Sequence, residues 1–242
     1  MRPYGPRPQA RVYGDKSHGY VNDVELVRAV FKDVRFIFIV RDPRDQALSA
    51  QATWGRNPLR SATHWAEVAR KVERLGLDGA ADTLVVRYED LTDDTETQLK
   101  RVCTFLHLPY AAEMGQLKRP AESRRPLATV VKQHAKYREL LSPTTVRRIS
   151  EITFPYLSKY GYSNEAVSNE RRLSRTQLRL LAYTDGLASL RFHIRKQGLR
   201  KGSIYYFRRR FESAASARQK FIEPVAVGDM GVSKVKATRL KG

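Results

Sequence analysis

The chain has 242 residues, which fits one domain, or one domain with an appendage. With 41% hydrophobic and 29% charged residues, the composition is that of an ordinary soluble globular protein and excludes a collagen, a coiled coil or a wholly disordered chain. The formal net charge of +20 favours anionic partners, namely nucleic acid, a membrane surface, or a phosphorylated or sulfated ligand.

The single cysteine, Cys103, cannot form an internal disulfide, so the sequence gives no sign of an oxidising compartment or of a thiolate metal site. The five histidines show no metal-ligand spacing either, so no metal is expected. The longest apolar run, residues 36–40, is far shorter than the ~20 residues that cross a bilayer. Residues 1–8 lack the apolar run of a signal peptide, so the sequence predicts a cytoplasmic protein.

The elements expected in chain order alternate between strand and helix. Apolar and β-branched runs predict buried strands at 34–40 and 83–88. Helices are expected from Pro43, capped by Asp42, to about Thr53, then over 61–75, after a Thr92 cap, and from Ser142 to about 160. The helix after Thr92 has an apolar face made of Leu99, Val102, Cys103 and Leu106. This order predicts an α/β layer fold with a mostly parallel sheet.

The positive charge is concentrated in the last third of the chain. Residues 165–242 hold 18 Lys/Arg and 6 Asp/Glu, against 27 and 19 in residues 1–164. We therefore predict an α/β domain over 1–164 and a basic extension over 165–242, helical over about 171–197 and disordered from Ala226. Residues 195–210 contain seven basic residues and no acidic one.

The end of the first predicted strand is the strongest candidate for a ligand site. In open α/β sheets, ligands bind at the carboxyl ends of the strands, beside the N-terminus of the following helix. Arg41 stands at that position and can bind a phosphate, Ser49 lies two helical turns further on, and Arg44 adds positive charge. A purely structural alternative, equally compatible with these residues, is an Arg41–Asp45 ion pair with Ser49 on the surface.

The segment Ile39-Val-Arg-Asp-Pro-Arg-Asp-Gln-Ala-Leu-Ser49 resembles the 3′-phosphate-binding motif of sulfotransferases that use 3′-phosphoadenosine 5′-phosphosulfate (PAPS). It matches R-[DN]-P-[RK]-D-x-x-x-S at every specified position. The resemblance implies that Arg41 and Ser49 bind the 3′-phosphate. It also implies a three-layer α/β sandwich related to P-loop kinases.

Further stretches resemble the same family in order and spacing. Lys16-Ser-His18 resembles the K-T-H triplet, which implies His18 as general base and Lys16 as its partner at the sulfonate group. Arg87-Tyr-Glu-Asp-Leu91 resembles Y-E-D-[LM], which implies Tyr88 against the adenine, and 103–109 resembles the end of the helix that follows. The stretch 123–126, with Arg124 and Arg125, resembles weakly the loop that closes on the 3′-phosphate. Alternatives are a turn histidine at position 18 and a packing role for Tyr88.

One motif of the family is missing from the sequence. No stretch like P-[KR]-S-G-T-[TS], which would bind the 5′-phosphosulfate through backbone N–H groups, precedes the matching region. A mis-assigned start, a partner chain that supplies the loop, or a chain that binds nucleotide without turnover would each explain this. We expect a truncated form with reduced or no activity.

The resemblance implies a hydroxyl or amine acceptor, and a carbohydrate is one possibility, since a basic extension can attract an acidic polysaccharide. A non-enzymatic alternative is that the chain binds nucleic acid or an anionic surface through residues 195–210. Aromatic residues stand among the arginines there, and they can stack on bases or insert into a membrane surface. The sequence predicts neither the identity of the acceptor nor the oligomeric state.

Overall fold

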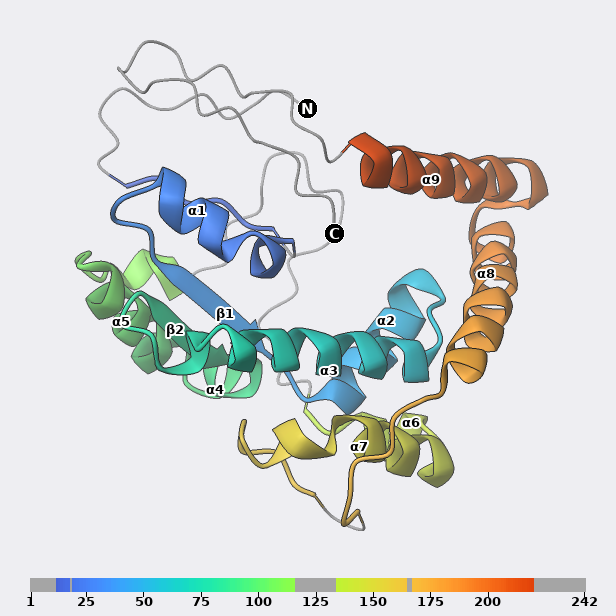
Figure 1. Ribbon diagram of the computed structural model, residues 1–242, viewed down its shortest axis with the longest axis horizontal. Coiled ribbons are helices and arrows are strands. Elements are labelled where there is room, and N and C mark those ends of the chain that lie inside the picture. The colour runs from blue at the N-terminus through green and yellow to red at the C-terminus, as the bar shows by residue number, and fades with distance from the viewer. Residues whose placement is uncertain (1–11, 18, 116–133, 165–166, 220–242) are drawn as a thin grey trace. The chain divides into compact units, whose positions relative to one another are not determined.

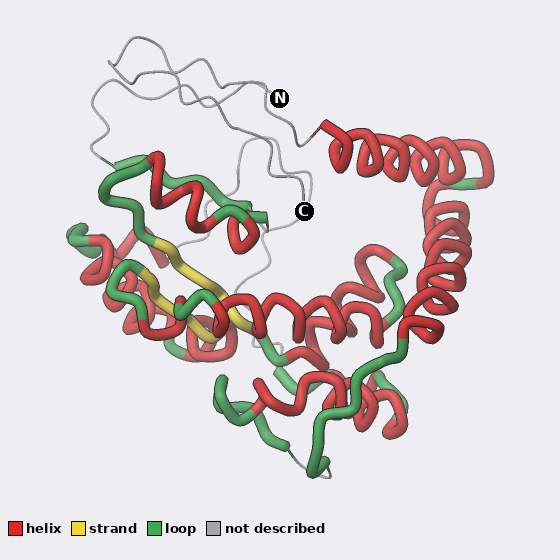
Figure 2. Tube along the Cα trace, in the orientation of Figure 1, coloured by secondary structure: helices red, strands yellow, loops and turns green. Residues whose placement is uncertain are grey.

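Two parallel strands form the sheet in the computed structural model, which describes residues 12–17, 19–115, 134–164 and 167–219. Strand β1 (Phe36–Val40) pairs with β2 (Thr83–Arg87) from Phe36 opposite Thr83 to Val40 opposite Arg87. Most other described residues are helical (Figure 2). The mixed α/β class and the parallel strand pairing are therefore confirmed, and the three-layer arrangement stays a prediction.

The helices follow one another along the chain in the order that Figure 1 labels. Before the sheet come η1 (Tyr20–Asn22) and α1 (Val24–Val30), and between the strands come α2 (Pro43–Trp54), α3 (Pro58–Arg74) and η2 (Leu77–Gly79). After β2 follow α4 (Tyr88–Asp93), α5 (Thr95–Leu106), η3 (Ala112–Gly115), α6 (Tyr137–Leu140), α7 (Pro143–Leu157), α8 (Arg175–Gln197) and α9 (Leu199–Gln219).

Three helices begin with the same two-residue signal, a polar cap followed by proline. The side chains of Asp42, Asn57 and Ser142 accept hydrogen bonds from backbone N–H groups in the first turns of α2, α3 and α7. Proline suits the position after the cap because its fixed φ is helical and no N–H is needed there. The predicted starts of α2 and α7 are confirmed.

The prediction for the helix after β2 needs a correction. Thr92 does not cap it, because residues 88–93 form the separate short helix α4, which contains Thr92. The cap of α5 is Asp94, whose carboxylate accepts a hydrogen bond from the backbone N–H of Thr97. Cys103, on the predicted apolar face, is buried and free.

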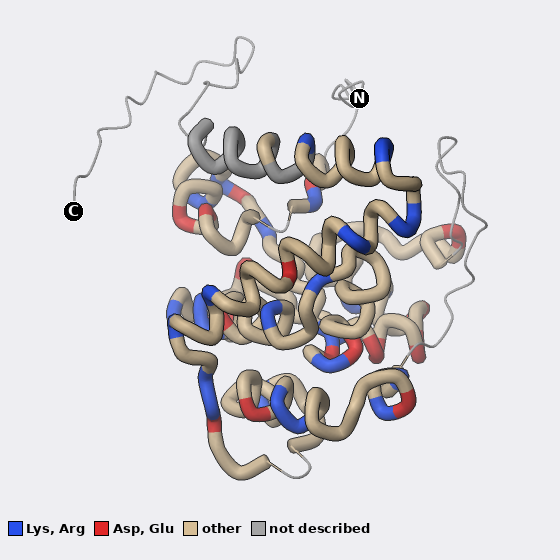
Figure 3. The backbone as a smooth tube through the Cα atoms, turned by 90° about the vertical axis from the view of Figure 1, so that its right-hand side faces the viewer, with Lys and Arg blue, Asp and Glu red and all other residues tan. Residues whose placement is uncertain are grey.

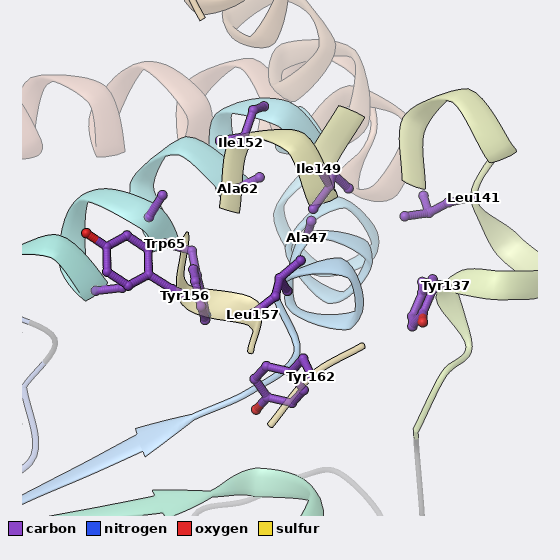
Figure 4. Packing of buried hydrophobic residues seen from close by; sticks show 12 residues of the cluster. Ala47, Ala62, Trp65, Tyr137, Leu141, Ile149, Ile152, Tyr156, Leu157 and Tyr162 are labelled. Atoms are coloured by element: carbon purple, nitrogen blue, oxygen red, sulfur yellow. The ribbon is translucent and has the colours of Figure 1, made fainter. Parts of the chain in front are cut away.

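The larger hydrophobic core joins α2, α3, α6 and α7 (Figure 4). Trp65 of α3 is central to it and packs edge-on against the rings of Tyr156 and Tyr160, with centroids 6.5 and 5.9 Å apart. The buried members are Ala47, Ala62, Trp65, Ala66, Ala69, Tyr137, Leu141, Ile149, Ile152, Tyr156, Leu157 and Tyr162. Since α2 follows β1 directly, this core holds the helix that begins at the strand end.

A smaller core lies along one side of β1. Phe36 packs there with Val24 of α1, Val72 of α3 and Leu77 of η2. The alternate residues of the strand are accessible to solvent, and Ile39 is 62% exposed. The prediction that this strand is buried on both faces is wrong, because only alternate side chains reach a core.

The chain folds into two compact units, Met1–Phe192 and His193–Gly242. The second unit contains the end of α8 and the helix α9, and Figure 3 marks the Lys and Arg positions in blue. The boundary at 164/165 and the role of the basic extension stay predictions, and residues 226–242 lie outside the described residues. None of the described helices is long and apolar enough to cross a membrane.

Candidate functional site

The two strands end side by side at one edge of the sheet. Val40 and Arg87 are register partners in parallel strands, so the residues that follow them, Arg41 and Tyr88, emerge at the same edge. The guanidinium carbon of Arg41 lies 4.5 Å from the centroid of the Tyr88 ring. Such a cation–π contact aligns the positive charge with the aromatic face. The structure thus brings together two of the residues singled out from the sequence.

Glu89, the residue after Tyr88, ties the two strand ends together. One carboxylate oxygen accepts a hydrogen bond from the backbone N–H of Asp42 at 2.9 Å, and the other accepts one from the Tyr162 hydroxyl at 2.9 Å. The indole N–H of Trp65 donates to the carbonyl oxygen of Arg41 at 3.0 Å. The peptide group between Arg41 and Asp42 is therefore held at its C=O and at its N–H by side chains from α3 and α4.

The positive charge of Arg44 is neutralised inside the protein. Its guanidinium forms a bidentate pair with Asp42, at 2.8 and 2.6 Å, and lies 4.5 Å from the ring centroid of Tyr137. Arg44 is 4% exposed and Asp42 is 7% exposed. Burial by itself would lower the pKa of Arg44, but the hydrogen bonds and charge of Asp42 outweigh it and raise that pKa. The expectation that Arg44 adds positive charge to the site is wrong, because a buried, paired arginine presents none.

Asp45 anchors the segment that begins at His134 to α2. Its carboxylate is 2% exposed and accepts hydrogen bonds from the backbone N–H groups of Ala135, at 2.7 Å, and Tyr137, at 3.0 Å. Burial raises the pKa of Asp45, and the two N–H donors oppose that shift. Asp45 therefore has a local structural role, as the structural alternative for this segment predicted. That alternative named Arg41 as the partner, whereas these two hydrogen bonds come from backbone N–H groups.

The structure gives only the local setting of the other predicted site residues. Ser49 is half-buried on α2, two turns after its start, and Lys16 lies in the exposed segment before η1. His18, Arg124 and Arg125 lie outside the described residues. Their proposed roles stay predictions.

Sequence reasoning missed the roles of Glu89, Trp65 and Tyr162. The sequence signal for Glu89 was its place in the Tyr-Glu-Asp-Leu stretch, but its partners are 47 and 73 residues away along the chain. Burial, and secondarily the negative charge of Glu89, raises the pKa of Tyr162, so its hydroxyl stays protonated and donates to Glu89.

No group of three His, Cys, Asp or Glu side chains that could hold a metal ion occurs in the part of the chain that the structure describes. At the strand ends, the structure places the Arg41 guanidinium beside the Tyr88 ring, next to a peptide group fixed by hydrogen bonds. That arrangement suits a ligand with a negative group next to a flat ring.

Comparisons with known proteins show a similarity to sulfotransferases over part of the chain. A model of the sulfotransferase family matches residues 4–112, a span that includes β1, α2, β2 and α5. Among solved structures, the chain is similar to a "Sulfotransferase Domain from the Curacin Biosynthetic Pathway", with 21% sequence identity and a TM-score of 0.46. That alignment covers 62% of this chain and 62% of the other. No curated protein matches the chain.

Proposed function

We propose that the chain is a sulfotransferase, since a model of that family matches residues 4–112, and that it acts on PAPS and moves its sulfonate group to a hydroxyl or amine acceptor. The observation that carries the proposal is the contact between Arg41 and Tyr88 where the two parallel strands end. A 3′-phosphate and an adenine ring are the negative and flat aromatic parts of one molecule, so one site of this kind serves both.

The residues at this edge fit the nucleotide end of PAPS. We assign the 3′-phosphate to the Arg41 guanidinium and the Ser49 hydroxyl, with Arg124 and Arg125 closing on it. The Arg41 guanidinium lies over one face of the Tyr88 ring, and we assign the adenine to a position against this ring. Near Arg41, Asp42 is paired with Arg44, and the Asp45 carboxylate accepts hydrogen bonds from two backbone N–H groups. Glu89 and Trp65 hold the peptide group between Arg41 and Asp42, which fixes the backbone from which the Arg41 side chain extends.

When PAPS is bound, it supplies the sulfonate group that is transferred. The transfer needs a base and a cation near that group. We assign His18 to accept the proton that the acceptor hydroxyl or amine loses, because an imidazole with an ordinary pKa near 6.5 is suited to this at neutral pH. Lys16, two residues earlier, neutralises the negative charge that develops on the transferred and leaving oxygens.

Four further points belong to the same proposal. The α/β domain over 1–164 is a three-layer sandwich, the acceptor includes carbohydrates, and the compartment is the cytoplasm. The chain also binds the nucleotide but transfers sulfonate weakly or not at all. The reason is that its sequence has no P-[KR]-S-G-T-[TS] loop for the 5′-phosphosulfate.

A transfer assay tests the proposal. The purified chain is incubated with radiolabelled PAPS and a panel of hydroxyl and amine acceptors, beside Arg41→Ala and, as a control, Arg74→Ala in the last turn of α3. We expect weak transfer that Arg41→Ala abolishes and Arg74→Ala leaves intact. Strong transfer by the wild type would contradict only the proposal of reduced activity. Equal transfer by the wild type and by Arg41→Ala would contradict the assigned site.

A further inference from the structure

One side of α9 is packed against the end of α8 within the second unit. Gly198, with φ of +83°, makes the left-handed turn between the two helices. A Cβ on Gly202 would lie 2.3 Å from the carbonyl oxygen of His193, so only glycine permits this approach. The rings of His193 and Tyr205 lie 4.9 Å apart. Gly202 therefore marks the inner side of α9.

The other side of α9 carries exposed apolar side chains. Ile204, Phe207 and Phe211 follow one another at the spacing i, i+3, i+7, which places them on one face of an α-helix, opposite Gly202. Their exposed fractions are 60%, 48% and 72%. Large apolar residues in such a continuous stripe are costly in water, so this face is suited to an apolar environment.

Positive charge borders the apolar stripe. Arg200 and Lys201 lie one turn before Ile204, Arg208 lies one turn after it, and all three are exposed. The sequence from 186 to 211 contains eight Lys and Arg residues and no Asp or Glu. A partner of this face must therefore be apolar at its centre and negative around it.

We propose that α9 binds the surface of a bilayer that contains anionic phospholipids, with Ile204, Phe207 and Phe211 inserted between the headgroups. A helix of this kind lies in the interface plane, gains from burial of its apolar stripe, and gains again from the attraction of Lys and Arg to the lipid phosphates. A nucleic acid would use the cations and stack on the aromatic rings, but it offers nothing to the exposed aliphatic side chain of Ile204. The bilayer uses both parts of the surface, and the proposal is independent of sulfonate transfer.

Vesicle flotation with the full chain tests this. The vesicles are phosphatidylcholine alone or phosphatidylcholine with phosphatidylserine. One variant combines Ile204→Ser, Phe207→Ser and Phe211→Ser, and a second combines Arg200→Gln, Lys201→Gln and Arg208→Gln. The matched control is Leu180→Ser with Tyr183→Ser, which removes two exposed apolar side chains from α8.

We expect binding to the anionic vesicles, a loss of roughly tenfold or more in each α9 variant, and no change in the control. Circular dichroism checks the helix content, and the single substitution Phe207→Ser replaces the triple variant if that variant loses helix. Equal vesicle binding by the wild type and the apolar variant would overturn the proposal. Failure to bind anionic vesicles would do the same, as would binding of single-stranded RNA in preference to them.

Discussion

The start of α2 and the exposed side of α9 use arginine in opposite ways. At α2, the Arg44 guanidinium is buried and bonded to Asp42, so its charge fixes the local backbone and is not presented to a ligand. On α9, Arg200 and Lys201 are exposed in a stretch without acidic residues. Net charge alone therefore says little about binding. The neighbours of each cation decide whether it holds the fold or meets a partner.

The buried pair at α2 gives the largest expected effect. Asp42→Ala removes both the cap of α2 and the partner of Arg44, which leaves a buried charge unpaired. We expect the free energy of unfolding to fall by about 3–5 kcal/mol, measured by urea denaturation. Glu96→Ala, which breaks an exposed ion pair with Lys100, is the control and should change little. If the two variants were equally stable, the contrast between buried and exposed charges would be wrong.

The close approach of the helices in the second unit gives a smaller effect. Gly202→Ala forces the backbone of α9 away from His193, because a Cβ would lie 2.3 Å from that carbonyl oxygen. We expect a loss of about 1–3 kcal/mol in local stability, visible as faster amide hydrogen exchange in α9. Gly79→Ala, where a Cβ meets nothing within 4 Å, serves as the control. Unchanged exchange in Gly202→Ala would mean that α9 is not packed through this side.

Removal of the Glu89 carboxylate, which links the two strand ends, should have the next largest effect on stability. Glu89→Ala leaves the Asp42 N–H and the Tyr162 hydroxyl without their acceptor, and we expect a loss of about 1–2 kcal/mol in thermal unfolding experiments. Glu89→Gln keeps one oxygen for the Asp42 N–H and should lose less. Equal losses in the two variants would show that the negative charge of Glu89, rather than hydrogen bonding, is what matters.

The half-exposed ion pair of Arg28 with Asp82 should contribute less to stability than the buried Asp42–Arg44 pair and more than the exposed Glu96–Lys100 pair. Arg28 donates two hydrogen bonds of 2.7 Å to Asp82, and these lower the pKa of Asp82 below its usual value. A lowered carboxyl pKa adds stability above the unfolded-state pKa of about 3.9, and that stability is lost as the pH falls towards the folded-state value. Asp82→Asn should therefore reduce the difference in melting temperature between neutral and acidic solution, by an amount equivalent to less than about 1 kcal/mol. An unchanged difference would show that this pair behaves like a fully solvated one.

Local signals in the sequence predicted most elements near the site. The β-branched runs of β1 and β2 and the Asp42-Pro43 start of α2 are short-range patterns, and each is confirmed. The sequence could not show that Arg44 is buried, since a cation looks the same in both surroundings. The contacts of Glu89 and Trp65 depend on segments far apart in the chain, which become neighbours only after folding. Thr92 was misplaced because two helices follow β2 where the pattern indicated one.

Isothermal titration calorimetry with 3′,5′-adenosine bisphosphate tests the central claim most directly, because this product-like ligand needs no acceptor. The account predicts saturable binding that is stronger than for 5′-AMP, which lacks the 3′-phosphate. Arg41→Ala and Ser49→Ala should each weaken it, Arg41→Ala by roughly tenfold or more because a charge-assisted pair is lost. The control Arg74→Ala should bind like the wild type. Equal affinities for the bisphosphate in the wild type and Arg41→Ala would contradict the account.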